Sequence, residues 1–387
     1  QFSLIQGELS DKTAKNYTNI ALHSKYANII YPSIVDENII GTFGDNFKKL
    51  KGLRYDYIDP DNKIMNIDNT KEDEYNGLKK YSSKICTIIN CIRHTLPIKK
   101  KGYKSGDILN QVDEPGGGIV FIYSKFLSFG IIPSAFALEE LGFNRYEIGK
   151  DADYTDKNLL VRNRDDDERF CAYNKCRLKD IDSSDVDKIA EYKKTFTQAR
   201  YIYLDGSIKK SKLDNLVKEV RGEGISNKPN IYGENIMVIL GSRAVEVGLS
   251  FFNVRQIHLL EPWYHYNQMI QVVGRGSRNF SHKRLEKQYR NIMIYLHIGT
   301  HKSVDRLEHV DEYLYKKSYV KKKNMVQVEK ILKQNAIDCT LNKKGNLFID
   351  EYYGDTLQIT DTNPITDSMG KRLKENIEDK TSSIGCD

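Results

Sequence analysis

Short apolar runs that alternate with amphipathic stretches constrain the fold of this chain most strongly. Five runs of strand length each end in a polar turn: Ile119–Tyr123, Tyr201–Leu204, Ile236–Leu240, Gln256–Leu260 and Asn291–His297. Stretches with apolar residues at helical spacing lie between them, such as Ile131–Leu141, which stops at Gly142, and Ile208–Val220. Strands that alternate with helices at this spacing predict a doubly wound parallel sheet with helices on both faces.

Composition and charge narrow the possible partners. The chain has 387 residues, of which 39% are apolar and 29% charged, so it has enough apolar side chains for a core and keeps a polar surface. Its formal charge of +7 permits an anionic partner such as nucleic acid without requiring one. No apolar run approaches the roughly 18 residues of a membrane span, and no apolar signal region opens the chain. We therefore expect a soluble, cytoplasmic protein with no membrane partner.

The length allows about two to three domains, and changes in composition suggest their boundaries. Residues 1–115 form a mixed linker or inter-lobe segment, and residues 116–300 form the α/β domain, with an acid-rich insertion at about 147–198. The glycines of EPGGG, at 114–118, precede a strand, which favours a hinge over a phosphate-cradling loop. Residues 301–345 are expected to form a helical extension, and residues 346–387 a tail with a disordered end.

Two groups of side chains suggest a metal site without establishing one. Cys86 and Cys91, like Cys171 and Cys176, form C-x4-C pairs, and zinc is one interpretation. The first pair lies in an expected helix, Leu78 to Arg93, where five-residue spacing places the thiols on different faces, so we interpret them as small apolar residues. The acidic run Asp165, Asp166, Asp167 and Glu168 follows no apolar strand that would fix its geometry. The sequence therefore predicts a solvated acidic loop and no metal site.

Two arginines close the segment QVVGRGSR. Arg275 and Arg278 are three residues apart at the end of a predicted helix that begins at Tyr266, so their guanidinium groups would leave one face together. Two fixed cations at this distance suit a polyphosphate, although an isolated pair of this kind is often only solvated surface. Their position after two strand-and-loop units favours a functional role.

Four motifs in order give the chain a family resemblance. GIVFIYS, YLDGS, GSRAVEVGLSF and QVVGRGSR resemble motif IV, the turn before motif V, motif V and motif VI in the second RecA-like lobe of superfamily 2 helicases. This resemblance covers about residues 118–298. The residue sequence of the motif V and motif VI region, and more loosely that of residues 25–345, resembles helicases of large cytoplasmic DNA viruses. These include the group related to the poxvirus early transcription factor small subunit. The implied fold is a RecA-like parallel sheet flanked by a mixed N-terminal segment and a helical C-terminal extension.

The resemblance implies roles for residues around a nucleotide. Arg278 would be an arginine finger, Arg275 a second contact to the γ-phosphate, and Gln271 a residue at the edge of the nucleotide site. In the motif V loop, Glu246 and Gly248 would couple that site to bound nucleic acid. This loop has Leu249 and Ser250 where many relatives carry Ile-Asp, which weakens the case for direct nucleotide contact by the loop.

A nucleic-acid strand would run across the strand ends, where backbone amides and small hydroxyls can hold phosphates without reading bases. The candidates are Ser124, Lys125, Gly206, Ser207, Gly241 and Ser242, and the alternative is that they are ordinary turn residues. Trp263, the one tryptophan, is expected in a core or between lobes rather than as a stacking platform. A later cluster of Lys316, Lys317, Lys321, Lys322 and Lys323 is either a contact to the nucleic-acid backbone or, as we expect, a solvated face.

The sequence lacks the Gly-x-x-x-x-Gly-Lys-Ser/Thr loop with which a first helicase lobe holds ATP and Mg²⁺. Because the chain begins at Gln1, we expect a processed product or a piece of a longer protein. The leading hypothesis is the C-terminal part of an ATP-dependent helicase or translocase, inactive alone and acting with an N-terminal lobe on DNA or RNA. The resemblance adds viral transcription, RNA polymerase or transcription-factor subunits as partners, and the viral factory or virion as location. The alternative is a non-catalytic module that binds nucleic acid or a polymerase.

Overall fold

A computed structural model describes residues 17–33, 40–58, 64–67, 77–93, 118–148, 154–162, 164–245, 248–299 and 309–334. The chain divides into two compact units, the first comprising residues 1–262 and 268–314 and the second comprising residues 263–267 and 315–387. None of the helices in the described ranges has the length and apolar character needed to cross a membrane.

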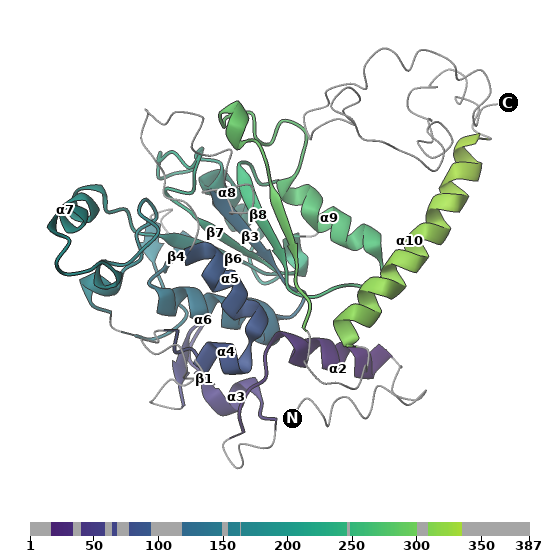
Figure 1. The fold of residues 1–387 in the computed structure, drawn as a ribbon, viewed down its shortest axis with the longest axis horizontal. Helices are drawn as coiled ribbons and strands as arrows, with labels where there is room; N and C mark the ends of the chain where they lie inside the picture. The colour runs from purple at the N-terminus through teal and green to yellow at the C-terminus, as the bar shows by residue number, and fades with distance from the viewer. Residues whose placement is uncertain are drawn as a thin grey trace. The chain divides into compact units, whose positions relative to one another are not determined.

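The first unit is built on a seven-stranded sheet with the order β5-β4-β6-β7-β3-β8-β9 (Figure 1). Its strands are β3 (Ile119–Tyr123), β4 (Asn144–Ile148), β5 (Tyr154–Asp156), β6 (Arg200–Leu204), β7 (Val238–Gly241), β8 (Val254–Leu259) and β9 (Met293–Leu296). Neighbouring strands pair in parallel except β5, which is antiparallel to β4. The predicted parallel RecA-like sheet is therefore confirmed, with one antiparallel strand added at its edge.

The sheet is covered on both faces because its strands are apolar on both sides. In β3, Val120 and Ile122 belong to the same core as the buried residues of α6 (Ile132–Leu141) and α5 (Ser83–Arg93). Phe121 points the opposite way and packs on Phe251, with ring centroids 5.2 Å apart. On that second face lies α9 (Tyr266–Gly276), whose Gly276 approaches β8 so closely that an added Cβ would be 3.1 Å from Ile257.

Helix α6 shows why the predicted helix boundaries hold. It continues a π-helical turn, η2 (Leu127–Ile131), and carries Pro133 in its first turn; the carbonyl of Ser128 in η2 accepts a hydrogen bond from Tyr31 OH at 2.5 Å. It ends at Gly142, whose φ of 108° lies in the left-handed region that favours glycine. The remaining helices are α2 (Tyr17–Asn28), α3 (Phe43–Asn46), α4 (Gly77–Tyr81), α7 (Val186–Thr195), α8 (Lys210–Val220) and α10 (Val310–Gln334), with the 3₁₀ turns η3 (Asp166–Glu168), η4 (Leu178–Asp180), η5 (Arg243–Val245) and η6 (Lys287–Tyr289).

The described part of residues 17–93 shares its core with the sheet. A two-stranded hairpin, β1 (Phe47–Lys49) and β2 (Tyr55–Tyr57), places Phe47 4.6 Å from the ring of Phe136 in α6. Helix α5 adds Ile85, Ile88, Ile89 and Ile92 to the same core. A segment that the sequence predicts as a linker is therefore packed in its described part. The domain boundaries themselves stay predictions, and residues 114–117 of EPGGG lie outside the described residues.

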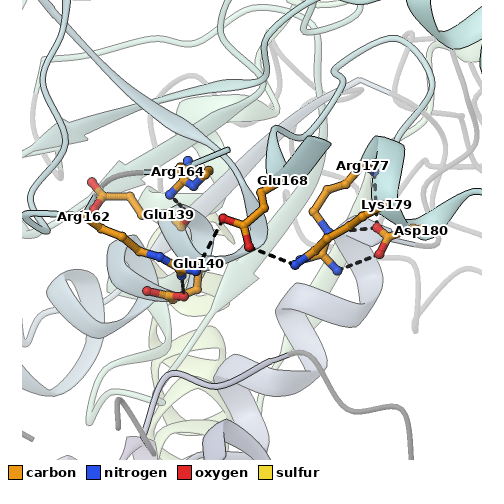
Figure 2. Close-up of polar contacts among 8 residues, drawn as sticks. All are labelled: Glu139, Glu140, Arg162, Arg164, Glu168, Arg177, Lys179 and Asp180. Atoms are coloured by element: carbon orange, nitrogen blue, oxygen red, sulfur yellow. Dashed lines mark hydrogen bonds and ion pairs between the residues drawn. The ribbon is translucent and has the colours of Figure 1, made fainter. Parts of the chain in front are cut away.

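Ion pairs connect α6 to the segment between β5 and α7 (Figure 2). Arg162 pairs with Glu140 of α6 and lies 3.5 Å from Glu168, which lies 3.1 Å from Lys179. The acidic run is divided by this arrangement, because its three aspartates are exposed while Glu168 is half-buried and paired. The sequence places residues 147–198 mostly at the surface, yet Leu159, Leu160 and Phe170 are buried in the same core as α6.

Candidate functional site

The central strands of the sheet bring most of the predicted contact residues to one edge. Because β3, β6, β7 and β8 are parallel, their carboxyl ends lie side by side. Backbone hydrogen bonds join the exits, since Ser124 N donates to Gly241 O at 3.2 Å and Ser242 N donates to Leu204 O at 3.0 Å. All six candidates for nucleic-acid contact, from Ser124 to Ser242, therefore lie at this edge, which we call the carboxyl edge.

Three of the six candidates reach solvent. Gly206 and Ser207 are exposed, and Asp205 holds their turn by accepting hydrogen bonds from Ser207 Oγ at 2.6 Å and Ser207 N at 3.0 Å. Lys125 is half-buried, and this burial lowers its pKa to about 8, although the nearby Glu261 carboxylate acts in the opposite direction. The exposed backbone and hydroxyl of this turn, together with the lysine, are suited to an anionic ligand.

The other three candidates are buried. Ser124 Oγ donates to the carboxylate of Glu261, whose two oxygens lie 3.1 and 2.9 Å away. Gly241 is the last residue of β7, and Ser242 is only 4% exposed. The Ser124 hydroxyl is therefore buried and engaged by Glu261, and Ser242 is buried as well. Their contact roles, like that of Gly241, stay predictions.

The two arginines of QVVGRGSR lie at the edge of the sheet opposite the carboxyl edge. There they contact residues that precede the amino end of β8. Helix α9 runs back along the sheet, and Phe251 N, just before β8, donates to Arg275 O at 2.8 Å. Arg275 Nη1 donates to Leu249 O at 3.2 Å, and Arg278 Nη1 donates to Ser250 Oγ. The helix ends before Arg278, yet both guanidinium groups reach consecutive residues of one loop. Arg278 is exposed, Arg275 half-buried, and Gln271 exposed one turn earlier in α9.

One loop, between β7 and β8, connects the carboxyl edge to the site of Arg275 and Arg278. It leaves β7 at the carboxyl edge and enters β8 at the other end of the sheet, as the link between two parallel strands of one sheet must. Within it Gly248 is exposed and has a φ of +82°, a conformation that disfavours any side chain with a Cβ. Ser250, at a position where the motif departs from its relatives, receives the hydrogen bond of Arg278. Glu246 lies outside the described residues.

The structure also identifies residues that sequence reasoning did not select. Glu261, in the run LLEPW, follows β8 directly and is buried beneath the carboxyl edge. Asn28 and Lys84 reach the same place from α2 and α5, and Arg243 is exposed in η5 beside Ser242. The available signal was a carboxylate immediately after an apolar strand, at the edge where the other candidates lie.

The two alternatives for a metal site were the C-x4-C pairs and the acidic run 165–168. Among the residues that the structure describes, no three His, Cys, Asp or Glu side chains are placed to hold an ion. Cys86, Cys91, Cys171 and Cys176 are free thiols, whereas His94, Cys339 and Cys386 lie outside those ranges. Burial raises the pKa of Cys86 and Cys91, which keeps both thiols protonated at neutral pH.

In the second unit, lysines of α10 gather on an aromatic ring. Lys317 Nζ and Lys321 Nζ lie 5.4 and 5.5 Å from the ring centroid of Tyr264. Lys322 pairs with Glu329 at 3.4 Å. Trp263 is half-buried beside Tyr264, with ring centroids 6.2 Å apart. These contacts leave both interpretations of the lysine cluster open.

A protein-family model matches the part of the chain that contains these strands and helix α9. Residues 157–280 match the helicase conserved C-terminal domain, and this range includes β6, β7, β8, the connecting loop and α9. The chain therefore carries a helicase C-terminal domain in a RecA-like α/β fold. The match begins within the segment that the sequence predicts as an insertion and ends two residues after Arg278.

Relatives named as helicases include proteins of large DNA viruses and a killer-plasmid protein of Kluyveromyces lactis. A "Putative ATP-dependent RNA helicase" of Acanthamoeba polyphaga mimivirus is 35% identical over 35% of this chain and 23% of its own length. "Putative helicase 009L" of Frog virus 3 is 33% identical over 33% of this chain and 14% of its own. An early transcription factor large subunit homolog of African swine fever virus is 28% identical over 38% of this chain and 13% of its own length. The alignments with these viral relatives cover less than a quarter of each relative, and the transcription factor named is a large subunit, whereas the sequence motifs suggested the small-subunit group.

Proposed function

We propose that this chain forms the C-terminal lobe of an ATP-dependent nucleic-acid helicase or translocase. One observation carries the proposal. Arg275 and Arg278 contact the loop 242–253, and this same loop starts at the carboxyl edge beside the exposed turn of Gly206 and Ser207. A single loop that reaches both ends of the sheet can connect events at a nucleotide to events at a nucleic-acid strand.

The nucleotide end suits a supporting role in phosphoryl transfer. Guanidinium groups fit the anionic oxygens of a polyphosphate, and a positioned arginine can stabilise the charge that develops during transfer. In this proposal Arg278 is the finger, Arg275 contacts the γ-phosphate and Gln271 lies at the edge of the site. In this proposal the metal and most of the ATP contacts belong to another lobe, which would carry the Gly-x-x-x-x-Gly-Lys-Ser/Thr loop.

The carboxyl edge is proposed to hold the nucleic-acid backbone. Lys125 supplies a cation and the turn of Gly206 and Ser207 supplies backbone amides, a set that contacts phosphates without reading bases. Gly248, and Glu246 in the same loop, would transmit the state of one site to the other. The mimivirus relative's name favours RNA as the strand, and the African swine fever virus relative's name favours a role in transcription. RNA polymerase as a partner is what the resemblance of the sequence motifs implies.

Substitution of Arg278 tests the nucleotide end in the full-length protein that contains this chain. Arg278→Ala should lower nucleic-acid-stimulated ATP hydrolysis by about a thousandfold or more while ATP affinity stays within a few-fold, because the finger acts on the transition state. Steady-state hydrolysis and equilibrium binding of labelled ATP measure the two effects. Arg284→Ala, which removes an exposed arginine paired with Glu223, is the matched control. Unchanged turnover in Arg278→Ala would reject the finger assignment, whereas a wild type without nucleic-acid-stimulated hydrolysis would favour a non-catalytic binding module.

A further inference from the structure

A buried polar network lies directly under the loop that presents Lys125. Glu261 is its centre: one carboxylate oxygen accepts a hydrogen bond from Lys125 N at 2.5 Å, and the carboxylate also accepts from Ser124 Oγ. Phe126 N then donates to Ser124 Oγ at 3.1 Å. Three consecutive residues of the loop after β3 are thus held, directly or through one hydroxyl, by a single carboxylate.

Glu261 is itself held by residues from the N-terminal segment. Asn28 Nδ2, at the end of α2, donates to Glu261 Oε2 at 2.8 Å. Lys84 Nζ, from α5, donates to Asn28 Oδ1 at 3.0 Å and to Leu260 O at 2.8 Å, the carbonyl just before Glu261. These contacts fix both the carboxylate and the backbone that carries it.

The charges of the network balance one another. Lys84 forms an ion pair with Asp311 of α10, with Nζ and Oδ2 2.5 Å apart, and Glu261 faces the half-buried Lys125. Glu261 is 4% exposed, Lys84 3% and Asp311 0%. Buried charges are costly without partners, so each member keeps the others in place.

We infer that Glu261, held by Asn28 and Lys84, is a positioning residue that fixes the loop of Ser124 and Lys125 for contact with the nucleic-acid backbone. The inference rests on the proposed function of the carboxyl edge. It extends that edge to α2 and α5, which lie outside the matched residues 157–280. The N-terminal segment is then part of the nucleic-acid site rather than a connection to it.

A double-mutant cycle on the chain as it stands tests this inference. Binding of fluorescein-labelled oligouridylate and oligothymidylate is titrated at several salt concentrations for the wild type, Glu261→Gln, Lys84→Met, Lys125→Ala and the double variant Glu261→Gln/Lys125→Ala. Gln keeps the shape of Glu261 but puts an amide donor against donors at Lys125 N or Asn28. Lys79→Met, an exposed lysine of α4, controls for charge. Tyr201→Phe, which removes a buried hydrogen bond to Glu139, controls for lost stability.

We expect Glu261→Gln, Lys84→Met and Lys125→Ala each to weaken binding by about tenfold and to lower the salt slope by about 0.7, the value of one phosphate contact on a single strand. The double variant should bind no more weakly than Lys125→Ala, because Glu261 acts through that residue. Losses that multiply in the double variant, or equal losses in Tyr201→Phe, would mean a general structural effect and overturn the inference. If the wild type binds and Glu261→Gln and Lys84→Met bind equally well, the inference about Glu261 is overturned while the proposed nucleic-acid edge stands. If the wild type shows no salt-dependent binding, the proposed nucleic-acid edge fails with it.

Discussion

Lys125 is the residue on which the electrostatics of the carboxyl edge depend. Burial lowers its pKa to about 8, while the Glu261 carboxylate below it favours the charged form. Its ammonium group lies 4.8 Å from the ring centroid of Phe126, a ring that Lys25 of α2 approaches at 5.8 Å. The charged groups that act on Lys125 are Glu261 and Asp311, which favour its cation, and Arg243 and Lys84, which oppose it.

This environment predicts a pH dependence of nucleic-acid binding. Lys125 is mainly charged below about pH 8 and mainly neutral above it, so affinity for a single-stranded oligonucleotide should fall several-fold between pH 7 and about pH 9. Lys125→Arg should remove most of this fall, because an arginine stays protonated throughout the range. Titrations of both proteins at constant ionic strength measure the difference. Parallel pH profiles for the wild type and Lys125→Arg would show that another group is responsible.

At the scale of elements, helix α6 is held to the segment after β5 by the carboxylate of Glu139. Leu159 N and Leu160 N donate to its two oxygens at 2.6 and 2.8 Å, and Tyr201 OH donates at 2.5 Å. Arg164 donates to the backbone carbonyl of Glu139 and lies beside this carboxylate (Figure 2). Burial nevertheless raises the pKa of Glu139 to about 7, since these donors compensate only in part for lost hydration.

The stability of this connection should therefore depend on pH. An unfolded glutamate has a pKa near 4.5, so on folding Glu139 takes up a proton between about pH 4.5 and pH 7. The free energy of unfolding should fall as pH rises through that window, by up to about 1.4 kcal/mol per pH unit from this group. Glu139→Gln should lose this contribution, as measured by denaturant unfolding at pH 5, 6, 7 and 8.

Glu168 provides the matched control for that experiment. It belongs to the same set of ion pairs, but its pKa is lowered in spite of its partial burial, because Lys179 and Arg162 stabilise its charged form. It therefore titrates below the window, and Glu168→Gln should keep the wild-type slope between pH 5 and pH 8. An unchanged slope in Glu139→Gln would contradict the role assigned to Glu139.

The sequence predicted those strands and helix ends that are determined by short apolar runs or by a glycine. The apolar runs of β3, β6, β7 and β8 and the glycine stop at Gly142 are visible in the sequence because apolar content and glycine chemistry determine them. Strand β4 was missed because NRYEI is polar, and its buried Arg145 lies 5.9 Å from the ring centroid of Tyr203 in the neighbouring strand β6. Such partners are tertiary and leave no periodic trace.

In the candidate site, too, local spacing predicts some contacts, whereas contacts between residues far apart in the sequence are not predicted. The closeness of Arg275 and Arg278 follows from their spacing on and just after one helix, so a sequence can indicate it. The hydrogen bond between Asn28 and Glu261 joins residues 233 positions apart, and no local pattern encodes it. Burial of Ser124 could not be foreseen either, because its partner Glu261 comes from a different strand exit.

For the whole molecule, the main question is whether residues 1–115 and the sheet form one folding unit. The hairpin and α5 bury aromatic and aliphatic side chains against α6, and Phe43, Phe47 and Tyr55 all lie within about 6 Å of the ring of Phe136. Removing these partners would expose a large apolar area of α6 and the sheet. It would also leave Glu261 without Asn28 and Lys84.

A chain that begins at residue 116, the boundary predicted from the sequence, therefore should not behave as an independent domain. We expect its thermal midpoint to fall by more than about 10 °C, or the protein to aggregate, because several large buried side chains lose their contacts. Circular dichroism and tryptophan fluorescence of Trp263 follow unfolding in both chains. Residues 1–115 supplied as a separate polypeptide should restore part of the loss by rebuilding the core around Phe136. A chain from residue 116 that unfolds at the midpoint of the complete chain would show instead that residues 1–115 are a linker and that the carboxyl edge is stable without them.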